Sequence, residues 1–306
     1  MNSQSDKKTP IALLAAASAG IAFGCMGTGS QLMARQGFGL TEIAASQFIV
    51  AALVMGVLSL AKFRNFPDRS SCVKLLGVGL LQPISALCLY CGIDNLTVGQ
   101  AVAIQFQYVW LTIAIQSAVD RKLPSGRVVL AALVIIVGTL LASGVAEDVL
   151  SDNSALNAVG IAFSVACAIA YSFFLFFNGR VAVDTHPVPR SFLLLVSGAV
   201  ITAIMAPELF AGGLGHIAAI APGALVLGLM TTVPVLCISY ASSRISGGTL
   251  AILTSMELPA AVVTGVVVLA DPTSIVKIAG VSLIMIGIIV SEIGKKEASV
   301  VCVTRG

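Results

Sequence analysis

The chain has 306 residues, of which 58% are hydrophobic and only 10% are charged, and its mean hydropathy is +1.02. Soluble domains carry about 25% charged residues. The composition therefore excludes a soluble globular protein, which could not cover its surface with so few polar groups. The net charge of +3 gives no reason to expect nucleic acid as a partner.

Long apolar runs separated by short clusters of charge dominate the chain. A helix needs about 20 apolar residues to cross the hydrocarbon of a bilayer, and ten runs approach that length. The period-two alternation of an outer-membrane barrel is absent. We therefore expect an all-α membrane protein with ten transmembrane helices. In chain order the expected spans are Ile11–Met33, Ile43–Ala61, Val73–Gly92, Ala101–Val119, Val128–Ala146, Ala158–Asn178, Phe192–Phe210, Ile220–Ser242, Leu250–Leu269 and Ile275–Ile293.

The segments outside these spans are too short to form a soluble catalytic domain. We expect residues 1–10 and 295–306 to be cytoplasmic tails. Residues 147–157 are rich in acidic side chains and are expected to form an external loop. This loop separates two halves, residues 11–146 and 158–294.

Lys and Arg are distributed very unevenly among the expected loops. When the N-terminus is placed in the cytoplasm, fifteen basic residues face the cytoplasm and two face outward. This positive-inside distribution predicts a protein of the cytoplasmic (inner) membrane with both termini in the cytoplasm. The cytoplasmic set is Lys7, Lys8, Lys62, Arg64, Arg69, Lys74, Arg121, Lys122, Arg127, Arg180, Arg190, Arg244, Lys295, Lys296 and Arg305, and the external set is Arg35 and Lys277.

The two halves resemble each other in sequence. An offset of 149 residues aligns the third, fourth and fifth spans with the eighth, ninth and tenth. Each half has five spans, and because five is odd the second half must enter the membrane from the opposite side. The pattern predicts two inverted five-helix repeats, with a binding site at their interface near the midplane. Matching positions include Gly79 with Gly228, Gly99 with Gly248, Ser125 with Ser274 and Gly138 with Gly287.

The end of the second half contains recognisable segments, namely Ala251-Ile252-Leu253, Glu257-Leu258-Pro259, Leu269-Ala270-Asp271-Pro272-Thr273-Ser274 and Gly280–Gly287. With these segments, ten helices in two five-helix repeats resemble the drug/metabolite transporter (DMT) superfamily, specifically its EamA-type permeases. Pro259 fits the mid-helix proline of that family, whereas Asp271 stands where Glu is more usual and Trp110 occupies the position that matches Pro259.

The resemblance implies a secondary active transporter that works by alternating access, with proton coupling or exchange. The implied solute is a small metabolite, such as an amino acid or a related compound, or a drug, and a sugar or nucleobase is the alternative class. A non-transporting membrane receptor or assembly factor remains a second alternative. Besides the solute and the lipid bilayer, a homodimer is left open as a partner.

Glu257 is the acidic residue that lies well inside an expected span, and no Lys or Arg is placed to pair with it. A carboxylate at the centre of a span costs about 2.5–3.5 kcal/mol on insertion scales, so such a residue is a functional candidate. We expect Glu257 to bind a proton or a cationic group of the solute. In the alternative, it is a neutral acid bonded within the bundle, to Thr254 or Ser255.

The repeat offset relates Glu257 to Tyr108 and Thr254 to Gln105. Residues three apart share one helix face, so the same face is polar in the fourth and ninth spans. We expect this face to bind the solute, although polar contacts between helices would produce the same pattern. Trp110, paired with Gln107 on a neighbouring face, is a further candidate, as a cavity wall or as packing.

Three more polar residues are weaker candidates for solute binding. Gln82 shares a face with Ser85 in the third span, Tyr171 shares one with Asn178 in the sixth, and Tyr240 follows Pro234 in the eighth. For each of them a structural role is the alternative. Small residues that allow close helix contact also recur in the first span, at Gly20, Gly24 and Gly27.

No catalytic, metal or cofactor site is expected. Cys88 and Cys91 have the spacing of half a zinc or redox site, but no second half accompanies them. His186 and His216 lie in loops on opposite predicted sides, so they cannot form a catalytic pair. We therefore do not expect an enzyme.

Overall fold

The structure, a computed structural model, describes residues 3–145, 157–271 and 273–293, and all regular secondary structure in these residues is helical. The expected external loop, apart from Asn157, and the expected C-terminal tail lie outside the described residues. The helices are α1 (Ser3–Arg35), α2 (Leu40–Lys62), α3 (Arg69–Ile93), α4 (Val98–Gln105), α5 (Tyr108–Asp120), α6 (Gly126–Ala142), α8 (Ala158–Asn178), α9 (Pro187–Met205), α10 (Glu208–Ala211), α11 (Gly213–Ser242), α12 (Gly247–Thr254), α13 (Glu257–Leu269) and α14 (Ile275–Ile293).

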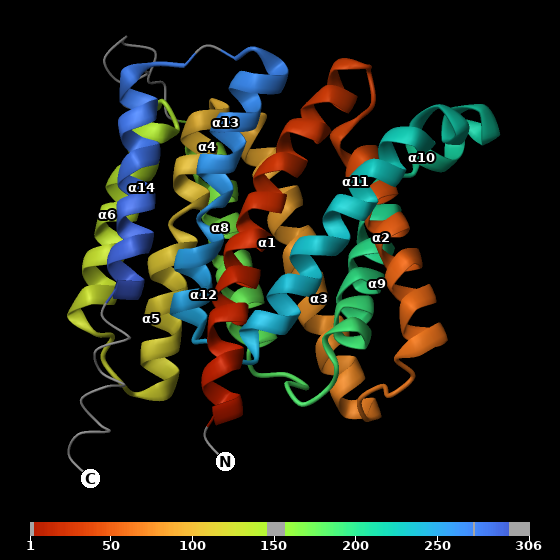
Figure 1. Cartoon of the computed structure of the whole chain (residues 1–306). Coiled ribbons are helices and arrows are strands. Elements are labelled where there is room, and N and C mark those ends of the chain that lie inside the picture. The colour runs from red at the N-terminus through yellow and green to blue at the C-terminus, as the bar shows by residue number, and fades with distance from the viewer. Residues whose placement is uncertain (1–2, 146–156, 272, 294–306) are drawn as a thin grey trace.

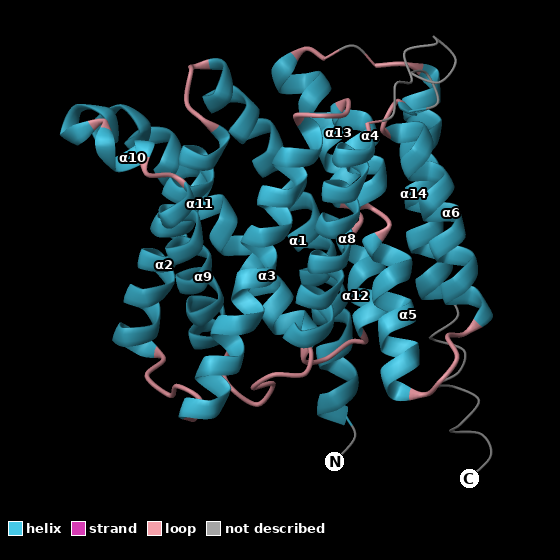
Figure 2. Ribbon diagram, turned by 180° about the vertical axis from the view of Figure 1, so that it is seen from behind, coloured by secondary structure: helices cyan, strands magenta, loops and turns pink. Residues whose placement is uncertain are grey.

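The long helices stand side by side and run alternately up and down, so that the loops gather at the two ends of the bundle (Figures 1 and 2). We call the end at which α1 begins the N-terminal face. Eight helical segments are long and apolar enough to cross a membrane, counting α4–α5 and α12–α13 as one segment each. The shorter apolar helices α6 and α14 pack against each other. The all-helical fold expected from the sequence is thus confirmed, with eight candidate membrane spans where ten were expected.

Each expected span falls on one or two of these helices, with differences at the ends. The helix α1 starts at Ser3, inside the expected tail, although its membrane-length part begins at Pro10. The seventh span, expected to reach Phe210, ends at Met205 because Pro207 follows it and the chain turns into the short helix α10. The helix α6 ends at Ala142, before the expected Ala146.

The fourth and ninth spans are broken helices, which the sequence did not predict. Between α4 and α5, the Gln107 N–H bonds the Ile104 carbonyl at 3.1 Å, three residues back. Between α12 and α13, the Met256 N–H bonds the Leu253 carbonyl at 3.3 Å in the same way. Such a tightened turn interrupts the regular i to i−4 bonding. Each span is therefore two half-helices that meet inside the bundle.

The two breaks are separated by 149 residues, the offset found in the sequence. α4 occupies residues 98–105 and α12 residues 247–254, while α5 occupies 108–120 and α13 occupies 257–269. A residue in the left-handed conformation follows each second half-helix, Arg121 with φ 51° and Ala270 with φ 55°. The backbone conformation of α4–α5 therefore recurs in α12–α13, although the side chains of the two segments differ.

Helices of one half pack mainly on helices of the other. α1 packs on α11 as α3 packs on α8, and α2 packs on α9 as α6 packs on α14. Within the last pair, a Cβ at Gly138 would lie 2.8 Å from the Gly280 carbonyl oxygen, and one at Gly287 would lie 3.1 Å from that of Ala131. These close approaches require glycine. The 149-residue offset relates Gly138 to Gly287 and Ala131 to Gly280. The contact between α6 and α14 is therefore the same when the two halves are exchanged.

Arg190, expected in a cytoplasmic loop, is instead fully buried in the first turn of α9. Its Nη1 donates to the Ser239 carbonyl at 2.7 Å, and its Nη2 donates to the side-chain oxygen of Asn178 at 3.0 Å and to the Asn178 carbonyl. These acceptors lie in the last turns of α11 and α8. Arg190 therefore joins three helix ends at the N-terminal face.

Candidate functional site

Glu257 is the first residue of α13 and lies directly after the break. It is deep inside the bundle, yet its side chain is partly exposed. Within the described part of the chain its carboxylate makes no hydrogen bond or ion pair. The hydroxyls of Thr254 and Ser255 donate instead to carbonyls of their own turns. The alternative in which either residue bonds Glu257 therefore finds no support.

The position of Glu257 has an electrostatic consequence. The start of a helix carries the positive end of the helix dipole, and this end of α13 lies inside the bundle. The N–H groups there are already bonded, since the Leu258 N–H donates to the Ser255 carbonyl and the Ala260 N–H to that of Met256. Among the described residues, no Lys or Arg pairs with the Glu257 carboxylate, so the helix dipole is the positive potential that we identify next to it.

Tyr108 occupies the corresponding position at the start of α5. Its hydroxyl lies 3.4 Å from the Thr254 hydroxyl, and its ring meets the Tyr171 ring edge to face with centroids 4.8 Å apart. The Tyr171 hydroxyl is buried and has no hydrogen-bond partner among the described residues. Glu257 is close enough to both tyrosines to interact with them electrostatically. The structure thus brings Glu257, Thr254, Tyr108 and Tyr171 together, and we call these four residues the central cluster.

Two glutamines lie near the central cluster. Gln105 is the last residue of α4 and is buried at the break. In the antiparallel pair α3–α8, the Ser85 hydroxyl donates to the Cys167 carbonyl at 3.1 Å. Gln82, one turn before Ser85, is therefore level with Tyr171. Neither glutamine amide makes a hydrogen bond within the described residues.

α1 covers the break between α12 and α13 through glycines. A Cβ at Gly20 would lie 2.5 Å from the Thr254 carbonyl oxygen, and a Cβ at Gly24 would lie 2.3 Å from that of Glu257. A Cβ at Gly27 would meet nothing within 4 Å. The close helix contact expected at these positions is therefore correct for Gly20 and Gly24 and wrong for Gly27.

We expect Gly24→Ala to destabilise the protein and to disturb Glu257, because the added methyl group meets backbone atoms that must shift. Overpacking of this kind costs about 1–3 kcal/mol. Gly27→Ala, one turn away on the same helix, is the matched control and should behave as the unaltered protein. The measurement is the temperature at which the detergent-solubilised protein loses its monodisperse peak. Equal temperatures for the two variants would contradict the contact.

Two predicted site residues lie elsewhere. Trp110 is 43% exposed, and its indole N–H donates to the Gln107 side-chain oxygen at 2.9 Å. It lines an apolar groove between α5 and α6 with Ile113 and Leu133. Tyr240 lies near the N-terminal face, where its ring stacks under the Arg244 guanidinium at 3.9 Å. The structure does not bring either residue to the central cluster.

A buried acid that the sequence did not reveal lies at the end of the bundle opposite the N-terminal face. Glu42, in the first turn of α2, accepts the Gly39 N–H at 2.8 Å and lies 2.8 Å from Nε2 of His216. The second span was expected to begin at Ile43, which left Glu42 in a loop. Its position three residues after Gly39 is a helix-start signal that places it in the first turn.

Among the described residues, no three His, Cys, Asp or Glu side chains gather in a way that would hold a metal ion. Cys88 and Cys91 are free thiols, as are the other described cysteines. The central cluster itself offers one carboxylate and three hydroxyls, and the amides of Gln82 and Gln105 lie near it.

The model of the EamA-like transporter family, which is part of the DMT superfamily, matches residues 10–144. No protein with a curated description matches the chain. Solved structures do, among them one described only as "Crystal structure of protein". It superposes with a TM-score of 0.69 at 17% identity, covering 90% of this chain and 98% of that chain. At this identity the likeness shows the fold alone.

Proposed function

We propose, from the membership of residues 10–144 in the EamA-like transporter family, that this protein is a secondary active transporter that moves a small metabolite across the cytoplasmic membrane by alternating access. The family consists of transporters and not of enzymes. The observation that carries the proposal is the carboxylate of Glu257 at the meeting point of two half-helices inside the bundle. Broken helices of this kind form the solute and ion sites of many transporters.

Ten spans in two inverted repeats are part of this proposal. The shorter helices α6 and α14 would be the fifth and tenth spans, next to the eight longer segments. Support comes from the recurrence of the helix breaks after 149 residues and from helix contacts that remain the same when the halves are exchanged. An exchange of conformation between such halves would convert an inward-open state into an outward-open one.

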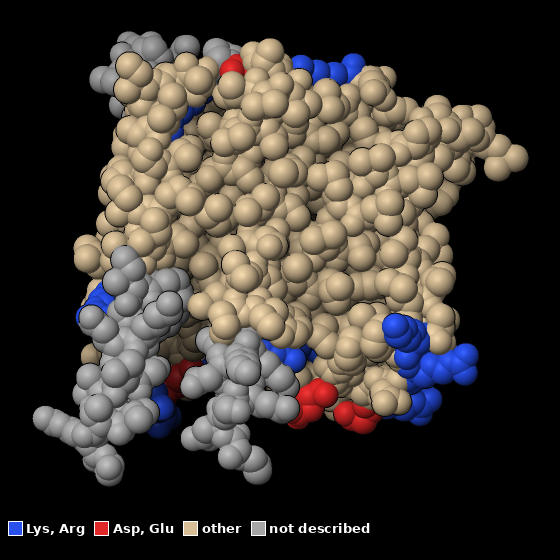
Figure 3. Space-filling view, in the orientation of Figure 1, with Lys and Arg blue, Asp and Glu red and all other residues tan. Residues whose placement is uncertain are grey.

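The proposed orientation places the N-terminal face in the cytoplasm. Figure 3 shows Lys and Arg gathered largely toward the edge of the molecule that carries this face. Arg35, at the end of α1, and Lys277, at the start of α14, lie at the other end. The positive-inside rule then orients the chain as the sequence predicts.

In the proposed mechanism the central cluster binds the solute near the middle of the membrane. Glu257 would take up a proton or hold a cationic group, while the free hydroxyl of Tyr171 and the amides of Gln82 and Gln105 would bind polar atoms of the solute. An exposed ion pair at each end joins the ends of two helices, Arg35 with Asp271 at 3.6 Å and Arg180 with Asp120. Exposed pairs are worth little in free energy, so they can open and close during transport.

Purified protein in liposomes should exchange at least one labelled solute from a panel of amino acids, sugars and nucleobases. Counterflow detects the exchange without a proton gradient, so it tests transport separately from coupling. Empty liposomes are the control for leakage. A protein that is folded and correctly inserted, yet moves none of the panel, would favour the alternative of a receptor or assembly factor.

A further inference from the structure

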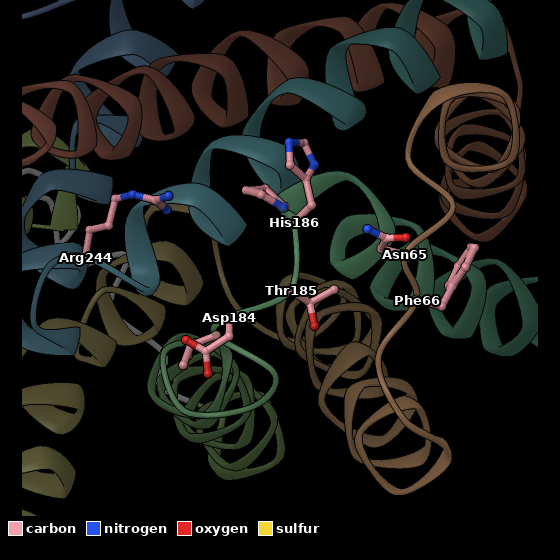
Figure 4. A pocket seen from close by; sticks show the side chains of 8 residues that line it. Asn65, Phe66, Asp184, Thr185, His186 and Arg244 are labelled. Atoms are coloured by element: carbon pink, nitrogen blue, oxygen red, sulfur yellow. The ribbon is translucent and has the colours of Figure 1, made fainter.

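The N-terminal face contains a cavity of about 460 Å³, lined by both polar and apolar side chains, that the central cluster does not include (Figure 4). Three loops form it: the α2–α3 loop with Asn65, the α8–α9 loop with Asp184, Thr185 and His186, and the α11–α12 loop with Arg244. It therefore lies where three pairs of helices end. In the proposed orientation it opens to the cytoplasm.

Arg244 presents a partly free guanidinium to this cavity. Its Cζ lies 3.9 Å from the centre of the Tyr240 ring, and its Nη1 donates to the Tyr240 carbonyl at 2.6 Å and to the Ser243 hydroxyl at 2.7 Å. In the described part of the chain, Nε and Nη2 have no bonding partner, and no acid lies within ion-pair distance. An oriented guanidinium with two free donors suits a carboxylate, which it can bind through two parallel hydrogen bonds.

Asp184 supplies the opposite charge to the same cavity. Its carboxylate makes no hydrogen bond or ion pair with any described residue, and in Figure 4 it lies below the extended Arg244 side chain. An acid and a base that line one cavity without pairing with each other complement a molecule that carries both charges. A purely anionic ligand would be repelled by Asp184, and a purely cationic one by Arg244.

The wall of the cavity is held in place before any ligand binds. His186 accepts the Val188 N–H through Nδ1 at 3.3 Å, and its ring stacks on Phe63 with centroids 4.1 Å apart. The two prolines that follow His186 and Val188 restrict the backbone of this turn. Arg244 is the positive group of the lining, so the carboxylate end of a ligand would face it.

We propose that this cavity is a receiving site for a zwitterionic solute of the amino acid type, with the carboxylate of the solute on Arg244 and its ammonium group on Asp184. The proposal rests on the proposed function in that the site would deliver its solute to the central cluster. It adds a second binding site, at the cytoplasmic end of the path, and names the charge pattern that the site selects.

The test is binding of three probes to the full chain in detergent, carrying Glu257→Gln so that the central cluster contributes less. The probes are leucine, leucinamide, which lacks the carboxylate, and 2-hydroxy-4-methylpentanoate, which lacks the ammonium group. Leucine should bind at least about tenfold more tightly than either analogue, as expected for the loss of one charge-assisted contact. Arg244→Gln should reduce leucine to the level of leucinamide, and Asp184→Asn should reduce it to the level of the hydroxy acid.

Arg64→Gln is the matched control, because Arg64 is exposed in the α2–α3 loop and does not line the cavity. Unchanged leucine affinity in Arg244→Gln and Asp184→Asn would overturn the proposal. So would preferential binding of the hydroxy acid that disappears in nanodiscs rich in phosphatidylglycerol, since that result identifies a site for an anionic lipid headgroup. Binding is measured without transport, so a failure here is distinct from a failure of the counterflow experiment.

Discussion

Glu257→Gln is expected to abolish the stimulation of uptake by an inward proton gradient, leaving the rate seen when a proton ionophore is present. Gln has nearly the shape of Glu, but its amide does not bind or release a proton near neutral pH. Because the Glu257 carboxylate makes no bond to a described residue, the substitution breaks no internal contact. The measurement is uptake of the solute identified by counterflow, into liposomes with and without a pH difference.

Counterflow by the same variant separates the two roles proposed for Glu257. If counterflow survives while gradient-driven uptake is lost, the carboxylate carries the proton. If both are lost, it holds a cationic group of the solute. Glu208→Gln is the control, because Glu208 is exposed in α10 and bonds Thr41. Full gradient stimulation in Glu257→Gln would show that Glu257 plays no part in coupling.

Arg190→Met is expected to cause the largest loss of stability among the substitutions considered. It removes the guanidinium from three buried acceptors, the carbonyls of Asn178 and Ser239 and the side-chain oxygen of Asn178. The Ser242 hydroxyl also lies within bonding distance of all three, but it can donate to one at a time. Two acceptors are therefore left unpaired, and at about 1–3 kcal/mol for each buried group the expected loss is about 2–6 kcal/mol.

Arg190→Met also removes the cost of burying a charged group, but this gain should not offset the loss of hydrogen bonds. The last turns of α8 and α11 each carry about half a negative charge at the carbonyl end of the helix dipole. Together they balance the guanidinium, although no carboxylate of the described residues pairs with it. Heating the protein in detergent and following its monodisperse peak measures the effect. Arg69→Met, at an exposed arginine of the same face, is the control. An equal transition temperature in both variants would refute the role assigned to Arg190.

The helical segments could be predicted because each crossing of the bilayer requires a long apolar run, which the sequence displays directly. The breaks in two of them could not. Neither Phe106-Gln107 nor Ser255-Met256 contains glycine or proline, the residues that mark a helix break in a sequence. Only Pro259, four residues after Ser255, gives a local signal, and Trp110 replaces it in the first half.

The central cluster could be predicted in part through the 149-residue offset. It relates position 257 to position 108, and the structure brings Tyr108 to Thr254. Trp110 shows the limit of this reasoning, because a mid-span position does not tell whether a side chain faces lipid or the interior. Arg190 shows another limit, since a count of basic residues on one side cannot distinguish a buried guanidinium from a solvated one.

The interleaved packing of the halves has a consequence for biosynthesis. α1, α3 and α6 find their main neighbours in α11, α8 and α14, all of which are made later. When the chain has left the ribosome as far as α6, the glycine surfaces of α1 and α6 are not yet covered by these partners. Insertion and assembly are therefore separate stages, as for other helical membrane proteins. The nascent first half must persist unassembled in the bilayer until its complement arrives.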